Sequence, residues 1–211
     1  MKIRRLIFTL LLFVSYGVKA QEPAGFDGHN WKAPYHLPVP EGWHIERFLL
    51  PASFAPQIQY KGVEDIRFTP GWAKKDTEEY WTYAFLWYLE SKPVTNAGII
   101  SENLNAYYTG LFRINTDSTK IPAEKIKSVI TELKKITAEG NDLETYSGTI
   151  DMMDYMTIQP IRLYCKVRVQ NCKDAGRSMI FYELSPQPFT HLNWKKLDNL
   201  WSGFKCTGSN P

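Results

Sequence analysis

A stretch of twelve residues, EYWTYAFLWYLE at positions 79–90, constrains the fold of this chain most, because six of the twelve are aromatic. In an extended strand, alternate side chains point to opposite faces of the sheet. Here one face would carry Trp81, Tyr83, Phe85, Trp87 and Leu89, and the other would carry Tyr80, Thr82, Ala84, Leu86 and Tyr88. Both faces are largely apolar, which is typical of a central strand that is covered on both sides. We therefore predict a buried strand at residues 80–90, and not an exposed platform of rings for a sugar.

The tryptophans of this strand leave a second interpretation open. An indole ring is large and apolar, but its N–H group needs a hydrogen-bond partner when it is buried. Two indoles on one face of a strand, here those of Trp81 and Trp87, are uncommon in a dry core. They could instead line a cavity, which would accept an apolar or ring-shaped ligand.

The rest of the chain mixes strand and helix patterns, without an internal repeat or a low-complexity linker. Strand patterns occur at residues 45–51, 57–60, 64–69, 143–151, 158–170 and 178–184, and helical spacing of apolar residues occurs around 104–112, 126–136 and 193–204. This order predicts a single α+β domain, residues 41–211, in which a mainly antiparallel sheet is flanked by about three helices.

The helix predicted at residues 126–136 depends on two kinds of signal. The apolar residues with the i, i+3, i+4, i+7 spacing of a helix face are Ile126, Val129, Ile130 and Leu133. Pro122 stands near the expected first turn and Gly140 beyond the expected end, as is usual for the two ends of a helix. Lysines and glutamates between these points would form its solvated outer face.

The first twenty residues, MKIRRLIFTLLLFVSYGVKA, have the plan of a secretory signal peptide: a charged head, a short apolar stretch and a small residue before the cut. We predict cleavage after Ala20 and an extended, Pro-rich arm at residues 21–40. The apolar run is too short to span a bilayer, which takes roughly 20 apolar residues. No later segment is long and apolar enough to do so. The sequence therefore predicts a bacterial protein that is secreted or periplasmic and has no membrane span.

The predicted signal peptide also accounts for the positive net charge of the whole chain. It holds four of the 25 Lys and Arg residues and none of the 22 Asp and Glu residues, so the mature chain has 21 basic against 22 acidic residues, a net charge of −1. A nearly neutral surface gives no electrostatic reason to expect a nucleic acid or an anionic membrane as partner.

Three cysteines predict one disulfide and one free thiol, because an odd number cannot pair completely in an oxidising compartment. Cys165 falls on the apolar face of a predicted strand. Cys172 lies in the polar turn that follows this strand, and Cys206 lies in the C-terminal tail. We therefore predict a bridge between Cys172 and Cys206, worth about 3 kcal/mol of stability, and a buried, reduced Cys165.

The polar stretch YKGVEDIRFTPGW, residues 60–72, holds the main candidates for binding or catalysis. On a strand, Glu64 points to one face, whereas Asp65 and Arg67 point to the other, where they can form an ion pair. Glu64 or Asp65 could act with Glu90 as the acid and base of a glycosidase. The alternative is an edge strand whose charges are solvated or paired.

Other signals of catalysis or metal binding are weak or missing. The chain has no G-x-S-x-G or S-x-x-K motif and no phosphate-binding glycine loop. His29, His36 and His44 are spaced too widely for a typical zinc motif. Asp151 and Asp154 lack the glycine and the dense alternation of a calcium loop. We therefore predict no metal site and no cofactor, and we leave the catalytic residues unassigned.

These observations favour a non-enzymatic binding or accessory module with an aromatic-lined pocket or surface. Its candidate binding residues are Glu64, Arg67, Trp72, Tyr83 and Trp87. The ligand would be a small apolar molecule or a glycan. Two alternatives stay open, a secreted glycan hydrolase with paired carboxylates and a purely structural surface protein. A hydrolase needs two carboxylates about 5–10 Å apart in a cleft, whereas a binding module needs a ring-lined cavity.

Overall fold

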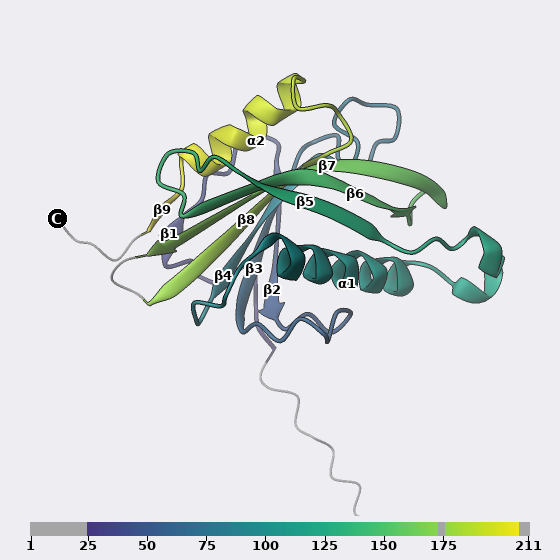
Figure 1. The fold of residues 1–211 in the computed structure, drawn as a ribbon, viewed down its shortest axis with the longest axis horizontal. Coiled ribbons are helices and arrows are strands. Elements are labelled where there is room, and N and C mark those ends of the chain that lie inside the picture. The colour runs from purple at the N-terminus through teal and green to yellow at the C-terminus, as the bar shows by residue number, and fades with distance from the viewer. Residues whose placement is uncertain (1–24, 173–175, 207–211) are drawn as a thin grey trace, which may run out of the picture.

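The computed structural model describes residues 25–172 and 176–206, which form a seven-stranded sheet in the order β2-β3-β4-β8-β7-β6-β5 (Figure 1). The strands are β2 (His44–Leu50), β3 (Gly62–Phe68), β4 (Tyr83–Leu89), β5 (Ile130–Ile136), β6 (Glu144–Asp154), β7 (Gln159–Cys172) and β8 (Arg177–Ser185). All neighbouring strands are antiparallel. The predicted signal peptide lies outside the described residues.

Two α-helices lie on opposite sides of this sheet (Figure 1). α1 (Ala97–Asn115) packs against β5 and β6, and α2 (Leu192–Ser202) packs against β8. α1 begins after Asn96, whose side-chain oxygen accepts a hydrogen bond from the backbone N–H of Ile99 at 2.9 Å, an ordinary N-cap. The α+β class and the antiparallel sheet are thus confirmed. The expectation of about three helices is corrected, because the described residues contain two α-helices.

The helix predicted at residues 126–136 is wrong, because this segment contains the edge strand β5. Two short 3₁₀ turns precede it, Ser118–Lys120 and Ala123–Lys125. Within β5, Thr131 and Leu133 turn inward while Glu132 between them is exposed, which is the period of a strand. The apparent helical spacing arises because Ile126 and Val129 lie in the connection before the strand. Pairing with β6 then outweighs the local pattern.

The strand predicted at residues 57–60 is also wrong, because these residues form a turn and a loop before β3. This loop packs against α1 where Gly110 meets the backbone of Phe54. A Cβ atom at Gly110 would lie 1.9 Å from the carbonyl oxygen of Phe54, so only glycine permits the contact. This close approach places Phe54 beside the α1 side of the sheet.

The aromatic strand is central, as the sequence predicts. β4 lies between β3 and β8, and all seven of its residues are buried. Tyr83, Phe85 and Trp87 belong to the core on the α1 side of the sheet, and Ala84 and Leu86 belong to the core on the α2 side. The strand begins three residues later than predicted. The preceding residues form a turn in which Trp81 has a left-handed backbone, with a φ of 52°.

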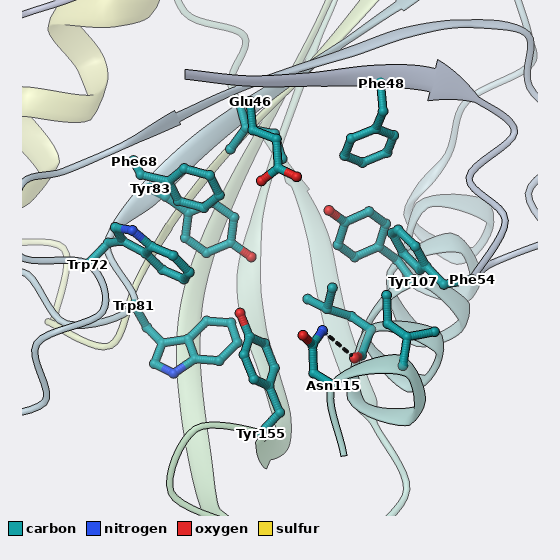
Figure 2. A pocket seen from close by; sticks show the side chains of 13 residues that line it. Glu46, Phe48, Phe54, Phe68, Trp72, Trp81, Tyr83, Tyr107, Asn115 and Tyr155 are labelled. Atoms are coloured by element: carbon teal, nitrogen blue, oxygen red, sulfur yellow. Dashed lines mark hydrogen bonds between the residues drawn. The ribbon is translucent and has the colours of Figure 1, made fainter. Parts of the chain in front are cut away.

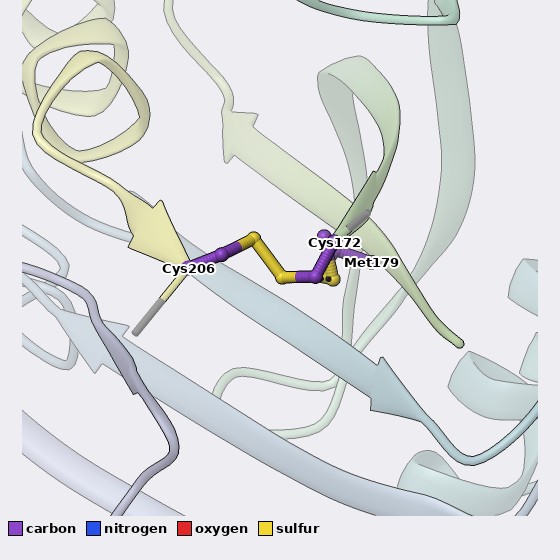
Figure 3. Close-up of a disulfide and its surroundings, with 3 residues drawn as sticks. All are labelled: Cys172, Met179 and Cys206. Carbon is purple, nitrogen blue, oxygen red and sulfur yellow. Dashed lines mark hydrogen bonds between the residues drawn. A yellow bond between two sulfur atoms is a disulfide. The ribbon is translucent and has the colours of Figure 1, made fainter. Parts of the chain in front are cut away.

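The predicted disulfide between Cys172 and Cys206 is present (Figure 3). Cys172 ends β7, and Cys206 ends the short strand β9 (Lys205–Cys206), which pairs with β1 (Tyr35–His36). The two Cα atoms are 5.8 Å apart, within the usual span of such a bridge. Cys165 is buried and unpaired, as predicted. The bridge therefore ties the two-stranded β1-β9 ribbon to the end of the main sheet.

Candidate ligand-binding pocket

A pocket opens on the α1 side of the sheet, over β2, β3 and β4 (Figure 2). Its volume is about 470 Å³, which falls in the range of about 300–1,000 Å³ that is usual for small-molecule sites. The lining residues are Glu46, Phe48, Phe54, Ile66, Phe68, Trp72, Trp81, Tyr83, Tyr107, Leu111, Ile114, Asn115 and Tyr155. Eight of these thirteen residues are aromatic, and we refer to the cavity as the aromatic pocket.

Three neighbouring strands form the floor of the aromatic pocket. Glu46 and Phe48 stand two residues apart on β2 and therefore point to the same face. Ile66 and Phe68 do the same on β3. The register pairs Glu46 with Ile66, and Phe68 with Tyr83 of β4. Strand alternation and register together bring these side chains from three separate segments to one surface.

Loops and α1 form the walls. Trp72 follows β3 and stacks on Phe68, with ring centroids 4.3 Å apart and an interplanar angle of 28°. Trp81 precedes β4 and meets Tyr155 edge to face, with ring centroids 5.1 Å apart. Tyr107 comes from α1. Packed rings of this kind hold the shape of the cavity in the free protein, because each ring restricts its neighbour.

Glu46 is the charged residue among those that line the aromatic pocket. Its side chain is exposed, and Figure 2 shows its carboxylate pointing into the cavity, with the hydroxyl of Tyr155 pointing in from another side. Within the described ranges, no Lys, Arg or His nitrogen comes within 4.0 Å of this carboxylate. Burial raises the pKa of Tyr155 to about 12, and the charges of Asp154 and Glu46 act in the same direction. The aromatic pocket is thus mainly apolar, with the exposed carboxylate of Glu46 at its edge.

Glu64 lies behind the wall and has no exposed surface. Its two carboxylate oxygens accept hydrogen bonds from the indole N–H of Trp87 at 2.9 Å and from the hydroxyl of Tyr107 at 2.6 Å. Burial raises the pKa of Glu64 to about 8, although these two hydrogen bonds favour the ionised form. The charge of Glu46 raises it further. Glu64 therefore holds Tyr107 in place rather than facing the cavity itself.

Asp65 and Arg67 lie on the opposite face of β3, where they form the predicted ion pair. Asp65 also accepts hydrogen bonds from the hydroxyl of Tyr35 and from Nε of Arg47, each at 2.9 Å. Arg67 donates to the carbonyl oxygens of residues 37 and 38 in the N-terminal arm. The edge-strand interpretation is corrected, because β3 has a partner on each side and both members of the pair are buried. This network attaches the arm to the sheet.

The five candidate binding residues are thus divided among three places. Trp72 and Tyr83 line the aromatic pocket. Trp87 and Glu64 form the hydrogen-bonded layer behind it. Arg67 lies on the other face of the sheet and takes no part in the aromatic pocket.

Three important pocket residues, Glu46, Tyr107 and Tyr155, were missed as candidates. A signal for Glu46 was available, because it alternates with Phe48 on a predicted strand. Tyr107 and Tyr155 come from a helix and from a turn, and nothing local in the sequence directs either one to this sheet face. Trp81 lines the pocket with a buried indole nitrogen that has no hydrogen-bond partner among the described residues. Figure 2 shows this nitrogen on the edge of the ring that faces away from Glu46.

The described part of the chain contains no group of three or more His, Cys, Asp or Glu residues that could hold a metal ion. Of the acidic pair considered for calcium, Asp151 binds Arg162 with N–O distances of 2.6 Å, and Asp154 accepts a hydrogen bond from Tyr80 at 2.5 Å. Neither helix in the described ranges is long and apolar enough to cross a membrane.

Comparisons with known proteins leave the function open. No family model matches the chain, and no curated protein matches it. Among solved structures, the chain is similar to the crystal structure of LpqN, a protein involved in cell envelope biogenesis of Mycobacterium tuberculosis. The identity is 10%, the likeness covers 80% of this chain and 78% of that one, and the TM-score is 0.30.

Proposed function

We propose that this protein is an exported, non-enzymatic binding module that takes a small, largely apolar molecule into the aromatic pocket. The observation that carries this proposal is a cavity of about 470 Å³ in which eight of the thirteen lining residues are aromatic. Sites for small molecules are commonly concave and apolar, with a few polar groups that orient the ligand. Glu46, Asn115 and the hydroxyl of Tyr155 supply such groups here.

Export is supported by a sequence pattern and by a disulfide. Residues 1–20 have the plan of a secretory signal peptide, which would direct the chain out of the cytoplasm. The disulfide between Cys172 and Cys206 is of the kind that forms and persists in oxidising compartments outside the cytoplasm. A secreted or periplasmic binding module would meet its ligand outside the cytoplasmic membrane.

The positions of the carboxylates give less support to a glycan hydrolase. Glu64 and Asp65 point to opposite faces of β3, so they cannot converge in one cleft. Glu90 follows the end of β4, where it is exposed and lies 3.9 Å from Arg177. A hydrolase built from the predicted carboxylates would therefore lack its acid and base pair.

One other carboxyl pair lies on the pocket side of the sheet. Glu46 and Glu64 are diagonal neighbours across β2 and β3, a relation that separates side chains by about 7–8 Å. Glu64 is fully buried, and Trp87 and Tyr107 occupy its oxygens, so it cannot reach a sugar. This pair therefore fits a binding pocket, in which Glu64 positions Tyr107, better than it fits a catalytic centre.

Binding of N-phenyl-1-naphthylamine, a neutral apolar dye that brightens in apolar sites, tests the proposal on the mature chain. We expect saturable binding, and we expect Trp72→Ala to weaken it at least tenfold, because a wall of the pocket is lost. Trp43→Ala is the matched control. Trp43 is also half-buried but packs on the α2 side of the sheet, so its loss should change the affinity less than twofold. No saturable binding, or equal effects of the two variants, would contradict the proposal.

A further inference from the structure

The lining of the aromatic pocket has a one-sided charge. Glu46 contributes a carboxylate that points into the cavity, and the lining residues within the described ranges include no Lys, Arg or His. No cationic side chain of the described residues pairs with this carboxylate. An anionic ligand would be repelled here, whereas a cation would meet an unpaired negative charge.

The rings around this charge add to the same preference. The faces of aromatic rings carry negative potential and attract ammonium groups, most strongly in the case of tryptophan. The pocket presents two tryptophans, Trp72 and Trp81, and three tyrosines. Tyr107 donates its hydroxyl proton to Glu64, so the lone pairs of its oxygen remain for the cavity. Quaternary ammonium groups are recognised in proteins by aromatic cages of this composition.

Resting on the proposed function, we propose that the ligand of the aromatic pocket is an organic cation, an ammonium group that carries an apolar body. The ammonium group lies beside the Glu46 carboxylate and against the rings of the wall. The apolar body fills the remainder of the cavity, whose volume of about 470 Å³ exceeds the needs of a trimethylammonium group. The carboxylate sets the preference for charge, and the rings supply the larger part of the contact area.

Two lysines line a different cavity close by. This neighbouring pocket shares Asn115 and Tyr155 with the aromatic pocket and is lined by Lys120 and Lys125. Lys120 pairs with Asp117 at 3.0 Å. Lys125 is exposed and does not line the aromatic pocket, so it serves as a control for long-range effects of charge.

Three soluble ligands of nearly the same shape test the inference: choline, its uncharged analogue 3,3-dimethylbutan-1-ol, and the anion 3,3-dimethylbutanoate. Titration calorimetry and ligand-observed NMR at low ionic strength would give the three affinities. We expect choline to bind about tenfold more tightly than the alcohol, and the anion to bind most weakly. Glu46→Gln should remove most of the preference for choline, leave only the part that the rings supply, and leave the affinity for the alcohol unchanged. Glu46→Asp should keep most of the preference, and Lys125→Gln should change it less than twofold.

The outcomes separate this inference from the proposed function. Equal binding of choline and the alcohol, or a preference that is undiminished in Glu46→Gln, would overturn the inference while leaving a pocket that binds apolar molecules. Binding of the neutral dye without binding of any of the three ligands would also overturn it. Failure of the dye and of all three ligands would overturn the proposed function as well.

Discussion

Replacing Glu64 with glutamine should remove a pH dependence that burial has built into the core. Glu64 has a pKa of about 8 in the folded protein against an ordinary value of 4.5. The folded state therefore holds this proton up to a much higher pH than the unfolded chain does. Its contribution to stability is fully present below pH 4.5 and is lost as the pH rises through 8.

The size of the effect follows from the two pKa values. Each pKa unit corresponds to about 1.36 kcal/mol, so a rise from 4.5 to about 8 corresponds to roughly 5 kcal/mol over the whole window. Between about pH 5 and pH 9 the loss is roughly 4 kcal/mol. This is a large part of the roughly 5–15 kcal/mol that is usual for the free energy of unfolding. The amide side chain of the Glu64→Gln variant carries no charge at any of these pH values, so the substitution removes the dependence.

The assay is urea unfolding of the wild type and of Glu64→Gln at about pH 5, 7 and 9. Between the lowest and the highest pH, the wild type should lose roughly 4 kcal/mol more of its free energy of unfolding than Glu64→Gln does, because only the wild type has this proton to lose. Glu183, which is also buried and also has a pKa of about 8, is present in both proteins and cancels. Glu41→Gln, at an exposed carboxylate, is the control and should follow the wild type. Parallel pH curves for the wild type and Glu64→Gln would refute the reasoning.

Two further predictions concern the connections of the sheet. Cys172→Ala should lower the free energy of unfolding by about 3–4 kcal/mol, because the bridge closes a loop with a sequence separation of 34 residues. Reducing agent should destabilise the wild type and a Cys165→Ala control but not this variant. Asp65→Asn should cost about 3–5 kcal/mol in urea unfolding, because it leaves the buried Arg67 without a counter-charge, and a loss below about 1 kcal/mol would show that water or another group compensates.

The central strand could be predicted because its signal is local and strong. A run of apolar residues on both faces leaves few positions in a sheet other than an interior one. The disulfide was predictable for a similar reason, since Cys165 alternates with apolar residues while Cys172 and Cys206 do not. In these cases the environment of a residue follows from its immediate neighbours in the sequence.

The errors arise where pairing between distant segments decides the structure. Residues 126–136 carry apolar side chains at both helical and strand spacing, and only the neighbouring strand β6 selects the extended form. Residues 57–60 have the composition of a strand, but they lie in a turn and a loop in which the N–H of Ile58 donates to the carbonyl oxygen of Ala55 at 3.0 Å. Phe54 of the same loop contacts Gly110 of α1. Neither partner can be identified from the local sequence.

The candidate site shows the same division. Trp72 and Tyr83 could be identified because they flank or occupy the aromatic strand. The place of the Glu46 carboxylate in the aromatic pocket depends on the register between β2 and β3, which puts Glu46 opposite Ile66. Tyr107 and Tyr155 depend on where α1 and the turn after β6 come to rest. Much of the wall of the pocket is therefore a property of the tertiary structure alone.

Uneven coverage of the sheet explains why one aromatic strand serves both a core and a cavity. α1 packs against β5 and β6, so β2, β3 and β4 on that side are covered by loops and by side chains from one face of the helix. Trp87 is fully buried and hydrogen-bonded to Glu64, whereas Tyr83 and Trp81, near the other end of the same segment, border the cavity with 3% and 1% of their surface exposed. Burial alone cannot distinguish these roles, since the wall of a narrow pocket is nearly as inaccessible as a core. The open volume beside the rings and the unpaired carboxylate of Glu46 distinguish the pocket wall from the core. In the part of the chain that the structure describes, this is the place where binding should be sought.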